Sequence, residues 1–307
     1  MVEISLTQKF GKGREVKMYK SFFILILLVM GLAAQQPAVN LKVMSLNIRY
    51  DNADDGINAW PERTELIVQT LAQEAPDVLG LQEALFRQLT FLDSALTNYR
   101  FYGIGRTDGV IKGEFSPIFY KKDRFLLAFA RTFWLSAQPD VPGSIGPGAQ
   151  FPRIFTLIRL FDLQSGKNIW IGNTHFSHVS DSARTLAARI LLEKAKQYCA
   201  SEPFVLMGDF NAEQGSQVYQ TLIGDDSLQL IDSYFHARQG HSGGEQTYNA
   251  FGKNQSNTII DHIFCNQSFQ VLKHYFLPVK KDDVFISDHF PVVAVLKLKL
   301  NKLPEKK

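Results

Sequence analysis

Residues 204–215 read FVLMGDFNAEQG, an apolar run that stops at a glycine and then presents a carboxylate and an amide. A short apolar run bounded by glycine is typical of a buried strand. In an extended chain Asp209 and Asn211 would project on the same side, because side chains alternate with a period of two. Burying such groups costs free energy unless they bind something. The stretch therefore predicts a strand that ends at a polar site.

The same pattern recurs along the chain, because other apolar runs also end in acids, amides or imidazoles. These runs are MSLN (44–47), LGLQE (79–83), IGNTH (171–175), IIDH (259–262) and ISDHFPV (286–292). One such ending is usually a solvated turn. If all these strands converge, however, their ends place carboxylates, amides and imidazoles together. We therefore expect one polar cleft built from distant segments.

The remaining sequence alternates between helical and strand-like patterns. Apolar residues at helical spacing predict helices over 61–75, 86–96 and 181–200, with a shorter one near 216–223. Strand-like runs joined by short turns fill much of the rest, and a stretch rich in glycine and proline, 140–152, predicts a loop. We find no internal repeat and no linker. These patterns predict one mixed α/β domain over 35–307, with sheets that are not purely parallel.

The N-terminus has the order of a secretory signal peptide, which is basic, then apolar, then small. Lys17 and Lys20 precede an apolar run from Phe22 to Leu32, which is short for a membrane span of roughly 20 residues. We predict a signal peptide over residues 1–34, with Met18 as a possible true start, and hence an exported protein, periplasmic or extracellular. An uncleaved N-terminal anchor is the alternative.

Charge and cysteine content narrow the class of function. The chain has 33 Lys and Arg against 30 Asp and Glu, and the part after residue 34 is balanced. A neutral body argues against a protein that coats nucleic acid by charge alone, although a local basic cleft stays open. Cys199 falls in a predicted helix and Cys265 in a predicted strand. We expect both to be small core residues, with a disulfide as the less favoured alternative.

The polar groups at the strand ends suit the hydrolysis of a phosphoester. Oxygen ligands such as Glu83 are those that Mg²⁺ prefers, and Mg²⁺ also binds phosphate oxygens. An aspartate can orient or deprotonate the attacking water. A histidine paired with an acid can donate to a phosphoryl oxygen. The mixture of imidazoles with amides does not favour a structural zinc site.

The motifs SLN, LQE, NTHF, GDFN, IDHIF and SDHFPV, in this order and spacing, resemble the endonuclease/exonuclease/phosphatase superfamily. These are the DNase I-like metal-dependent phosphoesterases, and the sequence is most similar to their secreted bacterial branch. The motifs span about 41–298. The resemblance implies a four-layer α/β sandwich, in which two packed mixed β-sheets are flanked by helices. It also implies Mg²⁺, or Mn²⁺, as the cofactor.

The resemblance further implies a role for each matching residue. Asp209 would orient or deprotonate the water, and His289, oriented by Asp261, would be the catalytic imidazole against the phosphate. His175 would contact the phosphate in the transition state. The other implied residues are Asn211 and Asn173 for substrate, and Glu83, Asn47 and Asp288 for the metal. Some members of the superfamily have an acid where this chain has Arg49, so a metal ligand is not expected there, and Arg49 would either contact phosphate or be a surface residue.

The stretch GIGRTDGVIKGEFSPIFYKKDRF (103–125) begins with a polar segment punctuated by glycine, which suggests a substrate clamp. Arg106 would bind a second phosphate and Glu114 would lie in the outer shell of the metal, and Arg153 in FPRIF is a similar candidate. The alternative is a polar hairpin loop without such a role.

The substrate stays open between a phosphodiester and a phosphomonoester. The neutral body favours a small phosphorylated molecule, and an exported nuclease is the alternative. A sphingomyelinase would need an apolar hairpin, for which 131–141 is the one candidate, although a core strand explains that segment better. A non-catalytic binding module would have lost residues of the cleft. We expect a monomer without an obligate protein partner.

Overall fold

The computed structural model describes residues 39–199 and 202–299 of the chain. The predicted signal peptide, residues 1–34, lies outside the described residues and stays a prediction. The described residues belong to one structural unit that begins at Val39. Within the described ranges, no helix combines the length and apolar character needed to cross a membrane.

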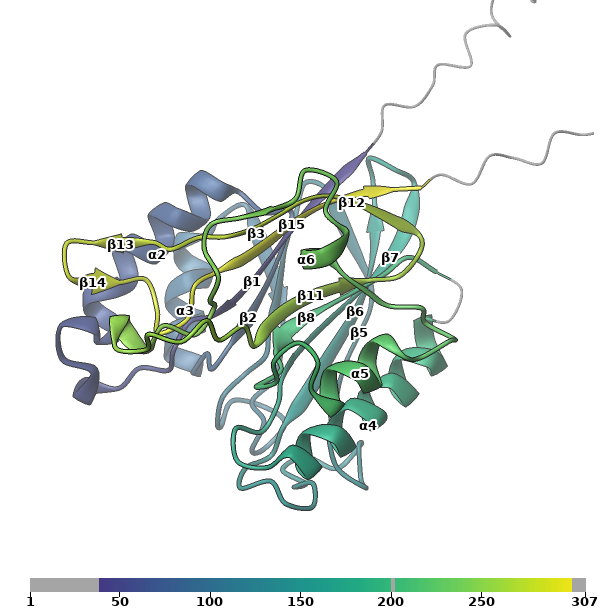
Figure 1. Ribbon diagram of the computed structural model, residues 1–307, viewed down its shortest axis with the longest axis horizontal. Helices are drawn as coiled ribbons and strands as arrows, with labels where there is room; N and C mark the ends of the chain where they lie inside the picture. Colours follow the sequence, from purple (N-terminus) through teal and green to yellow (C-terminus); the bar gives the residue numbers. More distant parts are fainter. Residues whose placement is uncertain (1–38, 200–201, 300–307) are drawn as a thin grey trace, which may run out of the picture. The chain divides into compact units, whose positions relative to one another are not determined.

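Two large mixed β-sheets form the centre of the described domain (Figure 1). The first has the strand order β10 (His241–Ser242), β12 (Phe269–Phe276), β15 (Val292–Leu298), β1 (Asn40–Asn47), β2 (Val78–Gln82), β4 (Ile118–Lys121) and β3 (Tyr99–Tyr102). The second has the order β5 (Phe125–Trp134), β6 (Ile154–Asp162), β7 (Lys167–His175), β8 (Phe204–Asp209), β11 (Asp261–Cys265) and β9 (Ile231–Asp232). A small separate hairpin pairs β13 (Lys280–Lys281) with β14 (Val284–Phe285).

Both large sheets contain parallel and antiparallel pairs, as the short turns between predicted strands indicate. In the first sheet β1 runs parallel to β2 and antiparallel to β15. In the second, β8 runs parallel to β7 and antiparallel to β11. Parallel neighbours end at the same edge of their sheet, so the carboxyl ends of β1 and β2 lie together, as do those of β7 and β8.

The helices lie close to their predicted positions. The four longest are α2 (Trp60–Glu74), α3 (Phe86–Ala95), α4 (Asp181–Cys199) and α5 (Gln217–Ile223), and the short ones are α6 (Ser233–His236), η1 (Ala53–Asn58) and η2 (Ala250–Gly252). Helix α2 has Pro61 in its first turn, where no backbone N–H is needed, and it ends just before Pro76. Sequence analysis missed α6 and the short strands, because two to four residues carry too little periodicity.

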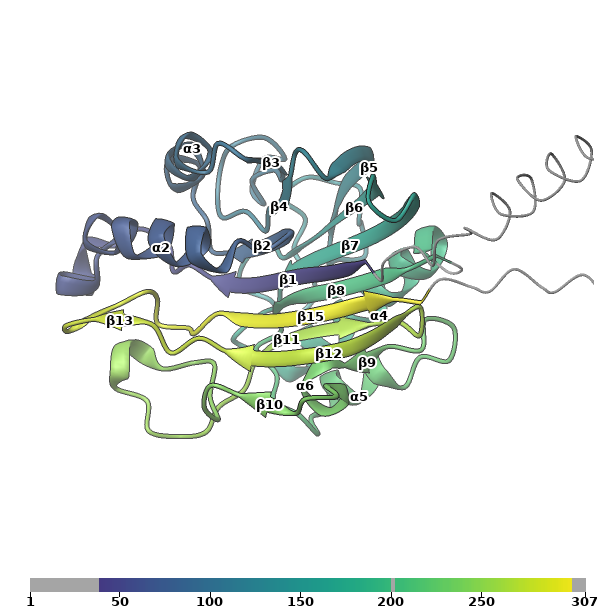
Figure 2. The same cartoon turned by 90° about the horizontal axis from the view of Figure 1, so that it is seen from above.

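Alternating strand side chains build three separate cores. In β1, Val43 lies in the core between the sheets, whereas Met44 packs with α2 and α3. In β8, Val205 lies in the core between the sheets, whereas Leu206 packs with α4 and α5. Figure 1 shows the resulting order of α2 and α3, the first sheet, the second sheet, and α4 and α5, and Figure 2 shows β1, β15 and β12 of the first sheet side by side. The predicted four-layer α/β sandwich is confirmed.

The face between the sheets changes from apolar to polar at one end. On β8, the next residue on this face after the apolar Met207 is Asp209. On β7, the last apolar residue on this face is Ile171, and Asn173 and His175 follow it on the same face. Strand β11 begins with Asp261, which pairs in register with Asp209. The polar site is therefore a continuation of the core between the sheets, formed where the apolar residues end.

The two cysteines are free and fully buried, and they lie in different cores. Cys199 is the last residue of α4 and lies in the core under that helix, and Cys265 lies between the sheets. Both are small core residues, as predicted.

Candidate active site

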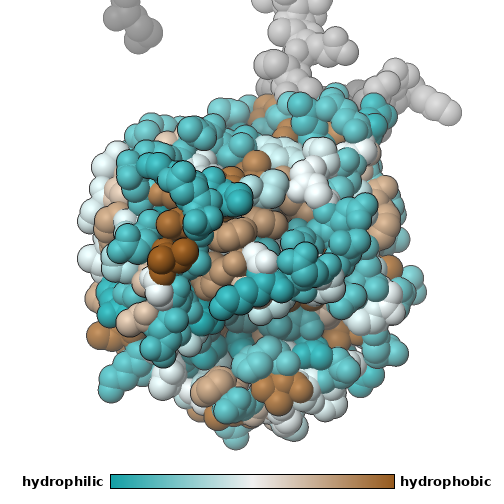
Figure 3. All heavy atoms as spheres, turned by 60° about the vertical axis from the view of Figure 1, so that its left-hand side comes forward, coloured by the Kyte–Doolittle hydropathy of each residue, from teal (hydrophilic) through white to brown (hydrophobic). Residues whose placement is uncertain are grey.

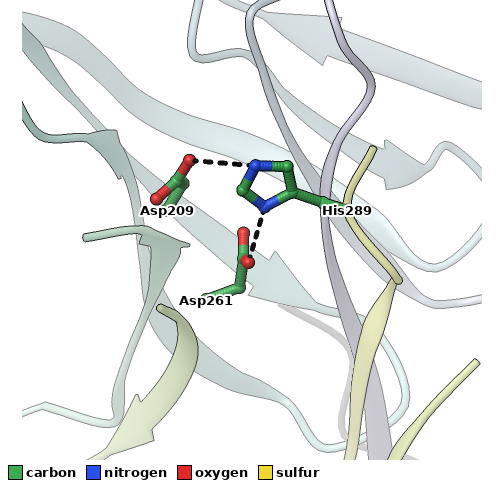
Figure 4. Close-up of side chains that lie close together, drawn as sticks. All are labelled: Asp209, Asp261 and His289. Carbon is green, nitrogen blue, oxygen red and sulfur yellow. Dashed lines mark hydrogen bonds and ion pairs between the residues drawn. The ribbon is translucent and has the colours of Figure 1, made fainter. Parts of the chain in front are cut away.

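An imidazole from the segment before β15 meets two carboxylates from the second sheet (Figure 4). His289 Nδ1 lies 2.8 Å from Asp261 Oδ2, and His289 Nε2 lies 3.8 Å from Asp209 Oδ2. All three residues are buried. Burial alone would lower the pKa of His289, but the charges of Asp261 and Asp209 raise it well above its usual range. The site therefore holds an imidazolium between two carboxyl groups at neutral pH.

Asp209 is placed to accept a proton. Burial, and then the negative charge of Asp261, raise the pKa of Asp209 to about 7, against the opposing effect of His289. Its Oδ1 accepts a hydrogen bond from the backbone N–H of Asn211 at 2.9 Å, and its Oδ2 accepts one from Asn47 Nδ2 at 3.0 Å. A carboxylate whose pKa is near the working pH suits general base catalysis.

Gly208 explains why the apolar run of β8 stops where it does. Strand β7 lies so close that a Cβ at this position would be 2.2 Å from the carbonyl oxygen of Thr174. Only glycine fits this approach. The close packing brings the ends of β7 and β8 together, and with them His175 and Asp209, which are paired in register.

His175 is a second imidazole beside Asp209. Its Nε2 lies 3.4 Å from Asp209 Oδ2 and its Nδ1 lies 3.9 Å from Glu114 Oε2. Burial, followed by the charges of Arg153 and Arg106, lowers the pKa of His175 well below its usual range. The two imidazoles that approach Asp209 therefore differ in charge, because His289 is protonated and His175 is neutral.

Glu83 stands just after β2 with its carboxylate held by two N–H donors. Asn47 Nδ2 donates to Oε1 and the backbone N–H of Tyr50 donates to Oε2, each at 3.1 Å. Glu83 has a φ of 61°, a left-handed conformation that is uncommon for residues other than glycine. Such a conformation costs free energy and is found most often at functional sites. Each oxygen of Glu83 keeps a lone pair for a further ligand.

The donor set fits a hard divalent cation at Glu83, with Asp288 also on the cavity wall. Asn47 differs from its predicted role as a ligand. Its nitrogen faces Glu83 and Asp209, and its oxygen accepts the backbone N–H of Arg49 at 3.0 Å. In this structure Asn47 therefore joins the two carboxylates.

Arg49 lies between the acids on this side of the site. It forms a two-pronged ion pair with Asp55, with both contacts at 3.0 Å. It also lies 4.0 Å from Glu83 and 3.9 Å from Asp288. A cationic side chain thus offsets part of the negative charge that Glu83 and Asp288 bring to the cavity.

The cluster of Asp209, Asp261 and His289 also has ligand atoms of metal-binding type within 4.8 Å of one another. However, His289 and Asp261 use their facing atoms for a direct hydrogen bond. That bond occupies one ligand atom of His289 and one of Asp261.

Two arginines form the wall beyond His175. Arg106 makes a bidentate ion pair with Glu114 at 2.8 and 2.7 Å. Arg153 lies just before β6, and its Nη2 is 3.1 Å from His178 Nδ1. Arg106 and Glu114 of the stretch 103–125 thus both line the cavity, and Glu114 holds the arginine in place. The role of substrate clamp stays a prediction.

These residues surround a cavity of about 630 Å³. Its lining combines acids, imidazoles, guanidinium groups and three aromatic rings: Arg49, Tyr50, Glu83, Arg106, Glu114, Phe151, Arg153, His175, His178, Asp209, Asn211, Tyr248, Ile260, Asp288 and His289. Asp261 is placed behind His289 and away from the lining. Most of the predicted site residues are therefore brought to one cavity.

The prediction that Asn173 binds substrate is wrong. This residue is fully buried, and its Nδ2 donates to the carbonyl oxygens of Leu81 and Pro117, at 2.7 and 2.9 Å. Its Oδ1 accepts from Gln82 Nε2 at 2.7 Å. The amide joins the two sheets and has no group left for a ligand. Asn173 lies two residues before His175, the last residue of β7, and on the same face, so its side chain remains inside the sandwich.

Sequence analysis missed the aromatic walls of the cavity. Tyr248 packs against His289 with ring centroids 5.1 Å apart, and Phe151 lies over the guanidinium of Arg106 at 5.3 Å. Tyr50 has Arg49 over its ring at 4.4 Å. Phe151 and Tyr248 lie in long irregular segments, where no strand end or helical period marks a site residue. His178, which sequence analysis left without a role, also lines the cavity.

Another cavity, of about 460 Å³, lies at the opposite end of β2. Its basic residues are paired, because Lys121 and Arg124 both contact Asp77, at 2.9 and 2.8 Å. Its lining contains no comparable set of imidazoles and acids, so the cavity that contains Asp209 and His289 is the candidate active site.

The four-layer sandwich and the acids and imidazoles at one of its ends are those of the DNase I-like class of proteins. The sequence profile of the Endonuclease/Exonuclease/phosphatase family matches residues 44–289. The chain belongs to this family, whose members are hydrolases that act on phosphoester bonds.

Several known proteins are similar to this chain. An endonuclease/exonuclease/phosphatase from Bacteroides vulgatus is 32% identical, with a TM-score of 0.81, and the match covers 85% of this chain and all of that one. A mannosyl-6-phosphatase of Bacteroides thetaiotaomicron is 32% identical, with a TM-score of 0.76, over 83% of this chain and 99% of that one. Nocturnin of Drosophila melanogaster is 30% identical, and the match covers 57% of this chain and only 28% of that longer protein.

Proposed function

We propose that this protein is an exported, Mg²⁺-dependent phosphoesterase that cleaves its substrate by attack of water. The observation that supports this best is the position of Asp209, which has a pKa of about 7 and lies within 4 Å of two imidazoles that differ in charge. Family membership supports phosphoester hydrolysis. The proposal of export rests on the sequence of residues 1–34.

The residues of the chain divide the work. Asp209 takes a proton from the water as the oxygen of that water forms a bond to phosphorus and the bond from phosphorus to the ester oxygen breaks. The ester oxygen leaves as an alcohol after taking a proton from solvent, and Asp209 returns its proton to solvent. His289, held by Asp261, donates a charged hydrogen bond to the phosphoryl oxygens, and neutral His175 donates another.

Glu83 and Asp288 are the residues that would hold Mg²⁺ near this phosphate. When bound, Mg²⁺ supplies positive charge against the negative charge that develops on the phosphoryl oxygens. Manganese has the same preference for oxygen ligands and is the alternative metal.

A small phosphorylated molecule fits the cavity better than a long nucleic acid. The chain outside residues 1–34 is neutral, and the face in Figure 3 is largely hydrophilic, with apolar side chains in separate groups. The likeness to a mannosyl-6-phosphatase supports a phosphorylated sugar or a compound of similar size. We propose that the protein works as a monomer without an obligate partner.

The test is release of nitrophenol from p-nitrophenyl phosphate and from bis(p-nitrophenyl) phosphate, first with Mg²⁺ and then with a chelator. The proposal expects release from at least one compound that stops on chelation and returns with added Mg²⁺. Asp209→Asn is the matched control, because it keeps the shape of the side chain without the proton acceptor. No release from either compound at high protein concentration would favour a non-catalytic binding module.

A further inference from the structure

The wall of the cavity beyond His175 contains a buried cation that lacks an anionic partner. Arg153 is only 6% exposed. Its Nη1 is buried without a hydrogen-bond partner among the described residues, and its Nη2 contacts only an imidazole, that of His178. No carboxylate of the described ranges lies within ion-pair distance of it. The neighbouring Arg106 differs, because Glu114 neutralises it.

A buried charge without a counterion is costly, so this wall favours binding of an anion. Burial, followed by the charge of Arg106, lowers the pKa of Arg153 to about 10, and the group therefore stays charged at neutral pH. His175 Nδ1, on the same wall, is a second buried polar atom without a hydrogen-bond partner in the described structure. Two residues with unsatisfied buried groups thus line the cavity that also contains Asp209.

Packed loops close the cavity behind these groups. The segment 105–113 packs against the loop 137–152 so tightly that a Cβ at Gly143 would lie 2.6 Å from the carbonyl oxygen of Thr107. Trp134 Nε1 donates to the carbonyl oxygen of Arg106 at 2.7 Å, which fixes the same segment from below. Phe151 lies over the guanidinium of Arg106. The wall beside Arg106 is therefore built from fixed contacts.

The two classes of phosphoester differ in what they present to such a wall. A phosphomonoester has three terminal oxygens and carries up to two negative charges. A phosphodiester has two terminal oxygens, one charge and a second ester chain that must leave the site. A guanidinium that binds two phosphate oxygens at once leaves a third terminal oxygen free on a monoester and none on a diester, and the doubly charged monoester also attracts the guanidinium more strongly.

We infer that Arg153 and the wall behind it select terminal phosphate groups, so that the protein hydrolyses phosphomonoesters in preference to phosphodiesters. This inference rests on the proposed function and adds the class of ester. Arg153 is thereby a specificity-determining residue, because a diester cannot make its full contact with this guanidinium.

The experiment compares kcat/KM for p-nitrophenyl phosphate and bis(p-nitrophenyl) phosphate, at saturating Mg²⁺, in the full chain and its variants. Arg153→Met removes the charge and keeps an aliphatic side chain, and Arg153→Lys keeps a positive charge without the bidentate geometry of the guanidinium. Arg131→Met is the matched control, since Arg131 is exposed on β5, outside the cavity, and pairs with Asp140.

The wild-type protein is expected to prefer the monoester. Arg153→Met should lower kcat/KM for the monoester about 10- to 150-fold, the range for a hydrogen bond to a charged group, and lower that for the diester less than about fivefold. For the monoester, kcat/KM of Arg153→Lys should lie between that of the wild type and that of Arg153→Met. Arg131→Met should leave the ratio of kcat/KM for the monoester to that for the diester unchanged. Competitive inhibition by inorganic phosphate should weaken in Arg153→Met by a similar factor.

Three results would overturn the inference. They are a wild-type preference for the diester, an equal fall for both substrates in Arg153→Met, and an unchanged ratio in that variant. If Arg153→Met does not fold, Arg153→Lys and the phosphate inhibition decide the question in the same way. A wild-type protein that releases nitrophenol from neither compound would instead count against the proposed function itself.

Discussion

Asn47 Nδ2 donates to Asp209 Oδ2 at 3.0 Å across the core between the two sheets, although the residues are 162 positions apart in the chain. The same nitrogen donates to Glu83, so one buried amide joins the carboxylate that we propose holds the metal with the one that we propose accepts a proton from water. The site is therefore a property of the whole sandwich, because it forms only when both sheets are in place.

Replacing Asp209 by asparagine should abolish most of the activity. We expect kcat to fall about a thousandfold, within the usual range for loss of a general acid or base. The melting temperature should fall by only a few degrees, because the variant keeps the shape of the side chain and loses one of the two hydrogen bonds that Asp209 accepts. Steady-state kinetics and thermal unfolding of the same preparation check this. A variant with near-normal kcat would show that another group handles the proton.

His289 and Asp261 should behave as one unit. His289→Gln and Asp261→Asn should each lower kcat, and the double variant should lose little more than His289→Gln alone, because Asp261 acts through the imidazole. A double-mutant cycle on kcat measures this coupling. Losses that simply multiply would mean that Asp261 has a role of its own.

Asn173 should matter for stability and not for substrate binding. Asn173→Ala removes the two hydrogen bonds that its Nδ2 donates to the buried carbonyl oxygens of Leu81 and Pro117, so unfolding should become easier by about 2 kcal/mol. KM of the fraction that stays folded should be unchanged. Urea unfolding and kinetics at low temperature separate the two effects. A raised KM with normal stability would restore the predicted contact with substrate.

Asp162 should make stability depend on pH at the end of the domain away from the active site. Burial would raise its pKa, but hydrogen bonds from Arg124 and Ser165 outweigh burial and lower it. Because the folded-state pKa lies below the unfolded value, this stabilisation is present at neutral pH and is lost as the pH falls below 3.8. Asp162→Asn should cost about 3 kcal/mol at pH 7, since Arg124 loses a buried partner.

The measurement for Asp162 is the free energy of unfolding in urea, compared between wild type and variant at neutral and acidic pH. The difference should shrink on acidification, and activity at neutral pH should be unaffected in the folded protein. A difference that stays constant with pH would show that the ion pair does not titrate as described.

Much of the fold could be predicted because local patterns and tertiary structure agree. Helices such as α4 have a clear apolar period, and strands such as β8 have an abrupt apolar end. The position of Asp209 follows from this alternation. Asn173 lies on the same face and the same kind of strand, but one alternation earlier, and only the packing of the opposite sheet shows that its amide is already used.

Other parts of the site could not be predicted because no regular period carries them. Tyr248 and Phe151 lie in irregular segments, and their places in the cavity depend on how those segments pack. The role of Arg49 depends on its pairing with Asp55 in η1, a contact that the strand-end pattern does not contain.

The most direct test of the account is a Mg²⁺ titration of phosphoesterase activity in the wild-type protein and in Glu83→Gln. We predict that the wild-type protein is inactive in chelator and recovers with Mg²⁺, and that Glu83→Gln needs at least about tenfold more Mg²⁺ or has no measurable activity. Activity that persists in chelator, or a Glu83→Gln variant with the wild-type dependence on Mg²⁺, would contradict the account.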